Sequence, residues 1–142
     1  QLHRIVPKAL ITGMTRRKLA LHGGGAARKS YLHATDLSRA VLEVIRSGTI
    51  GEIYNVGPDK PTAIRDIVQL CMIATGASFD EVVEMAPERT GQDNCYWISS
   101  EKIKALGWKQ QIPLADGVMT VLEWIKSYPE LLEMDTSFTM RA

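Results

Sequence analysis

A polar loop in the second half of the chain carries the side chains best suited to binding phosphate. Residues 87–94 read PERTGQDN, which puts a guanidinium, amides and carboxylates close together between two strand-like segments. Such groups suit a ligand with phosphates and hydroxyls, and Arg89 would supply a bidentate contact to phosphate. A solvated surface loop has the same composition, so the loop alone leaves both interpretations open.

Asn55 is a second candidate because it interrupts the apolar strand pattern at 53–56. A buried amide in a strand must find hydrogen-bonding partners. Asn55 would therefore either orient a ligand or fix the turn that follows at 57–61, and the pattern favours neither role.

Three consecutive glycines at 23–25 are the third candidate. A dinucleotide fingerprint needs GxGxxG at the start of a helix within a strand-helix-strand unit, whereas these glycines lie between two short strand patterns. They predict a hairpin turn rather than a nucleotide loop. The histidines, His3, His22 and His33, accompany no nucleophile motif and predict packing or surface roles.

Apolar periodicity and capping residues place these candidates on helices and short strands. The helix capped by Thr35 or Asp36 is the best determined, because Leu37, Ala40, Val41, Val44 and Ile45 recur at helical spacing before it stops at Ser47. Four further helices are predicted. The first spans 5–14, and the second is capped by Thr62 and closes at 75–76. The third is capped by Ser99 or Ser100 and ends at 106–107, and the fourth starts at Pro113 and is limited by Pro129. The predicted strands are 19–21, 30–33, 52–56, 82–85 and 96–98. Without regular strand-helix alternation, this order predicts an α+β fold with no parallel sheet of its own.

Length and composition predict one soluble globular domain. The chain has 142 residues, of which 45% are hydrophobic, and a net charge of +1 without the basic stripe typical of nucleic-acid binding. Cys71 and Cys95 are too far apart for a CxxC site and favour a reducing cytoplasm, and no apolar run predicts a membrane span. We expect a domain at 1–130 and a loosely attached tail at 131–142, and the start at Gln1 suggests a processed chain or a piece of a longer one.

Several of these segments, taken together, resemble one family. In order and spacing they are similar to the dTDP-glucose 4,6-dehydratases, which are extended short-chain dehydrogenase/reductases of the NAD-dependent epimerase/dehydratase family. The matching segments are 1–7, 23–25 leading to 29–36, 51–57, 89–93 with Tyr96, 101–103 and 106–108. The resemblance implies the small α+β substrate-binding lobe of such an enzyme, built of helices and short strands, with the Rossmann domain absent.

The resemblance also implies which residues face the sugar nucleotide. Arg4 stands where the family has a lysine near the nucleotide sugar, and Lys29 stands where it has an arginine facing the diphosphate. Asn55 and Tyr96 keep the family's residue types, and Arg89 matches its second diphosphate arginine. Gln92 falls at a position usually filled by histidine or asparagine. The expected substrate-binding residues are Arg4, Lys29, Asn55, Arg89, Gln92 and Tyr96.

The chain is expected to bind rather than to catalyse. The family's glycine-rich NAD loop, its YxxxK pair and its acid-base residues have no match in residues 1–142. NAD and hydride transfer are therefore implied only for an intact relative, and no catalytic residue, cofactor or metal is expected here. The implied function is the nucleotide-sugar-binding lobe of a 4,6-dehydratase or epimerase, with a nucleotide-diphosphate sugar as ligand and a Rossmann half or a second copy as partner. The alternative is a stand-alone, non-catalytic binding or oligomerising protein derived from such a lobe.

Overall fold

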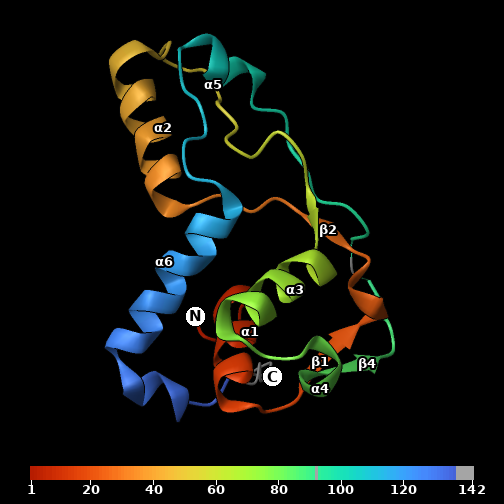
Figure 1. Ribbon diagram of the computed structural model, residues 1–142. Coiled ribbons are helices and arrows are strands. Elements are labelled where there is room, and N and C mark those ends of the chain that lie inside the picture. Colours follow the sequence, from red (N-terminus) through yellow and green to blue (C-terminus); the bar gives the residue numbers. More distant parts are fainter. Residues whose placement is uncertain (92, 137–142) are drawn as a thin grey trace.

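The computed structural model describes residues 1–91 and 93–136, and it combines helices with short strands (Figure 1). The helices are α1 (Ile5–Thr15), α2 (Ala34–Ser47), α3 (Ile64–Thr75), α4 (Phe79–Val82), α5 (Glu101–Ala105) and α6 (Leu114–Ser127), and the strands are β1 (Leu19–His22), β2 (Arg28–Lys29), β3 (Thr62–Ala63) and β4 (Val83–Ala86). Single 3-10 turns follow β1 at Gly23–Gly25 and α6 at Pro129–Leu132. The fold is α+β, as the sequence predicted.

The main core lies where α1, α3 and α6 pack against one another and against β1 and β4 (Figure 1). Each helix contributes one apolar stripe, because residues three or four positions apart share a helix face. Leu10, Ile67 and Leu122 are almost fully buried at this junction. Leu131 and Leu132, which follow the expected domain end at 130, also pack against this core.

A smaller core lies at the other end of the molecule, between α2 and α5. Ala40, Ile103 and Trp108 form its centre, with Tyr54 and Val56 packed against them. Ala40 is the only residue of the predicted apolar stripe of α2 that is buried, while Leu37, Val41 and Ile45 are exposed among the described residues. The periodicity of α2 was therefore predicted correctly, but most of its apolar face is not covered.

The strand pairing differs from the prediction. β1 does not form a hairpin but pairs in parallel with β4, in the register Leu19 to Val83, so the fold does contain a two-stranded parallel sheet. The hairpin prediction was wrong because Gly23–Gly25 form a 3-10 turn with positive φ at every residue, after which β2 pairs antiparallel with β3. The predicted strands at 30–33, 52–56 and 96–98 lie outside the strands of the structure.

Two predicted helix caps were also wrong. α2 starts earlier than expected, at Ala34, because the ring of His33 takes the capping role and its Nδ1 accepts the backbone N–H of Thr35 at 3.2 Å. Thr62 lies in β3, and α3 starts at Ile64 without a side-chain cap. The predicted end of α3 is confirmed, since Gly76 adopts the left-handed conformation that commonly closes a helix. No helix within the described residues is long and apolar enough to cross a membrane.

Candidate functional site

The segment that follows the polar loop is attached to β2 along its backbone. The N–H of Arg28 donates to the carbonyl oxygen of Asn94 at 2.8 Å, and the N–H of Tyr96 donates to the carbonyl oxygen of Arg28 at 2.9 Å. The hydroxyl of Ser30 adds a bond to the carbonyl oxygen of Tyr96 at 3.1 Å. These bonds bring Lys29 and Tyr96, which are 67 positions apart in the sequence, into adjacent segments.

Lys29 is the cation of β2 whose side chain contacts the polar loop. Its Nζ donates to the carbonyl oxygen of Asp93 at 3.0 Å, which leaves two of the three ammonium hydrogens for other acceptors. The neighbouring Arg28 contacts a different segment, since its Nη2 donates to the carbonyl oxygen of Pro61 at 3.0 Å. Of this adjacent pair, Lys29 is therefore the residue whose ammonium lies beside the polar loop.

The polar loop is fixed at both of its described ends. At its start, Nδ1 of His22 donates to the carbonyl oxygen of Pro87 at 2.9 Å, and at its end Asn94 bonds to β2. Arg89 is exposed and makes no hydrogen bond or ion pair to any described residue. Gln92, the predicted binding residue in the middle of the loop, lies outside the described residues.

Asn55 is exposed rather than buried, in a segment at 52–58 without regular secondary structure. Two contacts tie this segment to the region of Tyr96. Trp97, the next residue, donates its indole N–H to the carbonyl oxygen of Pro58 at 3.2 Å, and Ser100 bonds to both backbone groups of Gly57. Asn55 therefore lies on a segment that contacts the residues immediately after Tyr96.

Arg4 belongs to a different element from the other predicted residues. It precedes the first turn of α1, is exposed, and donates from Nε to Oε1 of Gln1 at 2.9 Å. A largely apolar groove of about 230 Å³ is lined by Val6 of α1, by Tyr31 and His33 of the segment after β2, and by α6 with the residues just before it. In the sequence, Arg4 lies two residues before Val6, and Lys29 lies two residues before Tyr31. Both Val6 and Tyr31 line this groove.

Burial, together with the charge interaction with Cys71, raises the pKa of Tyr31 to about 12. The phenol of Tyr31 is therefore neutral at physiological pH and supplies no base to the groove. Tyr31, Val6 and Pro113 make its walls apolar, which suits the packing of a ring or a hydrophobic side chain rather than acid-base chemistry.

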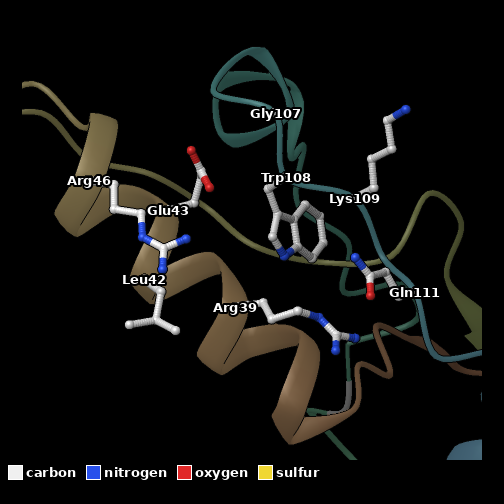
Figure 2. Close-up of a pocket in the computed structure, with 8 residues that line it drawn as sticks. All are labelled: Arg39, Leu42, Glu43, Arg46, Gly107, Trp108, Lys109 and Gln111. Carbon is white, nitrogen blue, oxygen red and sulfur yellow. The ribbon is translucent and has the colours of Figure 1, made fainter.

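A second pocket, of about 140 Å³, lies between α2 and the segment after α5. Figure 2 shows Arg39, Glu43 and Arg46 on α2 and Lys109 beside the indole of Trp108. Arg39 donates to the buried carboxylate of Asp36, so part of the positive charge of this pocket is already neutralised. None of the five predicted binding residues that the structure describes lines this pocket, and no motif in the sequence indicated it.

The glycines at 23–25 do not fit a dinucleotide. Their 3-10 turn leads into β2 rather than into a long helix, and Gly25 is buried against the start of α3. A Cβ at Gly25 would lie 2.7 Å from the backbone nitrogen of Arg65, so the backbone of α3 occupies the space beside it. Within residues 1–91 and 93–136, no group of three or more His, Cys, Asp or Glu residues could hold a metal ion.

Comparison with known proteins finds several 4,6-dehydratases that resemble the chain, although no family model matches it. The chain is 32% identical over 128 residues to dTDP-D-glucose 4,6-dehydratase of Mus musculus. The match covers 87% of the chain and 36% of that protein. It is 28% identical over 127 residues to a trifunctional UDP-glucose 4,6-dehydratase/UDP-4-keto-6-deoxy-D-glucose 3,5-epimerase/UDP-4-keto-L-rhamnose-reductase of Arabidopsis thaliana, with 89% of the chain and 19% of that protein covered.

Solved structures agree with these relatives. The dTDP-glucose 4,6-dehydratase of Streptomyces venezuelae, with NAD and TYD bound, matches 92% of the chain and 40% of its own length with a TM-score of 0.83 and 25% identity. The enzyme of Bacillus anthracis in complex with NAD matches with a TM-score of 0.82 and the same identity, over 91% of the chain and 41% of its own length. The chain spans well under half the length of these relatives. In sequence and in fold, the chain is therefore similar to the carboxyl-terminal portion of extended short-chain dehydrogenase/reductases of the dTDP-glucose 4,6-dehydratase kind.

Proposed function

We propose that this chain is the nucleotide-sugar-binding lobe of an NAD-dependent 4,6-dehydratase or epimerase, and that residues 1–130 form this lobe. The observation that carries the proposal is the attachment of the polar loop to β2, which brings Lys29 next to the segment of Tyr96. The choice of ligand is supported by the Streptomyces venezuelae enzyme, whose structure has NAD and TYD bound and resembles 92% of this chain.

The diphosphate is the part of the ligand that the loop recognises. Lys29 offers two ammonium hydrogens that no described residue accepts at one end of the loop, and Arg89 offers a guanidinium that pairs with no described residue near the other end. An arginine binds phosphate oxygens bidentately, whereas a lysine acts as a point charge, so the two residues have complementary roles. Both side chains can bind without breaking an ion pair to a described residue.

The sugar and nucleoside are held by the remaining residues of the predicted set. Tyr96 is about half exposed beside β2 and offers both a ring face and a hydroxyl. Asn55 supplies an amide from the neighbouring segment, Arg4 adds a cation from the start of α1, and Gln92 adds a second amide from the loop. NAD contacts are assigned to no described residue, because the glycine turn does not fit a dinucleotide.

Thermal-shift titration tests the proposed function. dTDP and UDP, each alone and as the glucose conjugate, are expected to raise the melting temperature, because a ligand that binds only the folded state stabilises it by about 2.7 kcal/mol at 100 times its Kd. Lys29→Met and Arg89→Met are expected to remove the shift. Lys18→Met is the matched control, since Lys18 is an exposed lysine paired with Glu84 at 3.6 Å. The absence of any shift in the unsubstituted chain contradicts the proposal.

A second candidate function is a stand-alone, non-catalytic protein that associates with itself. The exposed apolar residues of α2 favour it, because contiguous apolar surface of this kind is usually covered by association. Light scattering separates the two functions, since a monomer at high concentration contradicts self-association. The two free thiols support a reducing compartment such as the cytoplasm for either function.

A further inference from the structure

The pocket between α2 and the segment after α5 is lined mainly by cations. Arg39 and Arg46 come from α2, Lys109 directly follows Trp108, and Glu43 is the carboxylate among the lining residues. Even if Glu43 and the nearby Asp36 each offset one cation, one positive charge remains at the pocket. Positive charge in a concave site favours a negatively charged ligand.

Arg39 uses only part of its guanidinium within the chain. Its Nη2 donates to Oδ1 of Asp36 at 2.5 Å, whereas its Nε is buried and donates to no described residue. Buried donors in native proteins are nearly always paired, so an unpaired one indicates a partner that the chain itself does not supply. The side chain of Arg39 is 34% exposed and lines the pocket, so its guanidinium can be reached from there.

Arg46 and Lys109 are exposed, and neither side chain makes a hydrogen bond or ion pair to a described residue. Glu43 forms no ion pair with Arg46, although both lie on α2, and instead accepts the hydroxyl of Ser47 at 3.2 Å. Figure 2 shows Arg46 and Lys109 on opposite sides of the indole of Trp108, with the stem of Lys109 extended away from it. That stem is flexible, so both cations can turn toward a ligand above the indole.

The indole of Trp108 gives the pocket a fixed wall. It is 4% exposed, and its Nε1 donates to the carbonyl oxygen of Asp36 at 3.0 Å. Leu42 adds a second apolar group to the lining. The volume of about 140 Å³ is well below the roughly 300–1,000 Å³ of sites for drug-sized ligands, so the pocket suits an anionic group with few further atoms and not a whole nucleotide.

We propose that this pocket is a second anion site, which binds a phosphate group carried by a small phosphorylated molecule or present as free phosphate. The guanidinium groups of Arg39 and Arg46 donate to the phosphate oxygens in forked geometry, and Lys109 adds a point charge. The site goes beyond the proposed function and does not rest on it, because none of the described residues assigned to the nucleotide sugar lines this pocket.

The pocket also lies apart from the exposed apolar stripe of α2. Successive helical residues are about 100° apart around the axis, which places Arg39 and Arg46 on the flank of α2 opposite Val41 and Ile45. The cations therefore stay accessible whether or not the apolar stripe is covered by association.

NMR of the full chain, labelled with ¹⁵N, tests the site. Inorganic phosphate and glycerol 3-phosphate are titrated at neutral pH, with NaCl at matched ionic strength and glycerol as controls. The Nε–H of Arg39 and the indole N–H of Trp108 report on the pocket, because both are buried beside it. We expect saturable shifts of both signals with a Kd of about 1 mM. Tighter binding of glycerol 3-phosphate identifies a phosphomonoester as the ligand, and tighter binding of phosphate identifies the free ion.

Two substitutions provide the second measurement. Arg46→Gln and Lys109→Gln change exposed side chains, so both variants are expected to fold, and a thermal melt checks this. Each is expected to weaken phosphate binding by about fivefold, as for an exposed charge pair. Lys60→Gln is the matched control, since Lys60 is an exposed lysine without a partner among the described residues and does not line the pocket. It is expected to bind phosphate like the unsubstituted chain.

Three results overturn the inference. The first is the absence of saturable shifts at Arg39 and Trp108 with either phosphate compound. The second is an equal shift with NaCl, which would mean general screening of charge. The third is unchanged binding in both Arg46→Gln and Lys109→Gln, or equal weakening by the control.

A dTDP titration of the same variants keeps the two proposals apart. Arg46→Gln is expected to leave the thermal shift with dTDP unchanged, whereas Lys29→Met is expected to remove that shift and to leave phosphate binding in this pocket intact. Phosphate binding without any thermal shift from dTDP contradicts only the proposed function.

Discussion

The indole Nε1 of Trp108 donates a hydrogen bond to the backbone carbonyl oxygen of Asp36 at 3.0 Å, although the two residues lie 72 positions apart. The carboxylate of Asp36 accepts the backbone N–H groups of Gln111 and Ile112, each at 3.0 Å, and the guanidinium of Arg39 at 2.5 Å. One buried residue thus fixes the first turn of α2 to the segment after α5. The small core depends on this connection.

Asp36→Ala is expected to lower the free energy of unfolding by about 3 kcal/mol or more, because it leaves Arg39 and two backbone donors without their acceptor. Urea denaturation measures the loss. Asp66→Ala is the matched control, since Asp66 also lies in the first turn of a helix but is exposed. It is expected to cost about 0.3–1 kcal/mol through the helix dipole. Equal losses in the two variants would show that the buried network is not stabilising.

The same carboxylate predicts an acid dependence of stability. Burial alone would raise the pKa of Asp36, but the hydrogen bonds from Arg39, Ile112 and Gln111 and the charge of Arg39 outweigh it and hold the pKa below its ordinary value of 3.8. The stabilisation is therefore complete above pH 3.8 and is lost as the pH falls through the lower pKa of the folded state. Urea denaturation measures the free energy of unfolding as the pH is lowered from 6. This free energy is expected to decline less for Asp36→Asn than for the unsubstituted chain.

Helices were predictable from the sequence where their partners lie within this chain. The apolar faces of α1, α3 and α6 pack against one another, so the apolar periodicity of each segment corresponds to a face that is buried in the structure. That periodicity was enough to locate each helix. The stripe of α2 followed the same rule but has no comparable cover among the described residues. Periodicity therefore indicates which face is apolar, but not what that face contacts.

Strand pairing was not predictable, because it depends on distant residues. Leu19 pairs with Val83 across 64 positions, and nothing near either residue indicates the other. For the site, chemistry identified Arg89 and Asn55 as candidates, whereas Lys29 and Tyr96 were indicated only by the family resemblance. Their proximity arises from the bonds between β2 and residues 94–96, which no local pattern encodes.

Gly25→Ala is expected to be clearly more destabilising than Gly24→Ala. Both glycines have positive φ, at 70° and 62°, so each substitution carries a backbone cost of about 1–2 kcal/mol. At Gly25 the added Cβ would also lie 2.7 Å from the backbone nitrogen of Arg65, whereas at Gly24 it meets nothing within 4 Å. The free energies of unfolding of the two variants test this difference, and equal values would mean that α3 shifts freely away from the turn.

Cysteine reactivity is expected to separate the two thiols. Burial raises the pKa of Cys71 to about 12, and Cys71 is fully buried, whereas Cys95 is exposed. Because the thiolate is the reactive form, Ellman's reagent at pH 8 is expected to titrate only Cys95 in the folded chain and both thiols in urea. Cys95→Ser is expected to abolish the reaction of the folded protein. Rapid reaction of both thiols without denaturant would contradict the packing of α3 against α1.

Ser100→Ala tests the attachment of the Asn55 segment. The buried hydroxyl of Ser100 accepts the N–H of Gly57 at 2.7 Å and donates to its carbonyl oxygen at 2.9 Å, so one side chain satisfies both backbone groups. Its removal leaves these groups unpaired in a buried place, and we expect a loss of about 2–4 kcal/mol in the free energy of unfolding.

The matched control is Ser99→Ala, because Ser99 is exposed and accepts only a long bond of 3.4 Å from the N–H of Glu101. We expect this variant to cost about 0.5 kcal/mol. The Ser100 variant is also expected to weaken nucleotide binding, because the segment that carries Asn55 loses its fixed point at Gly57. Hydrogen exchange at Gly57 reports this loosening directly. Unchanged exchange in Ser100→Ala would mean that Trp97 and Pro58 hold the segment without the serine.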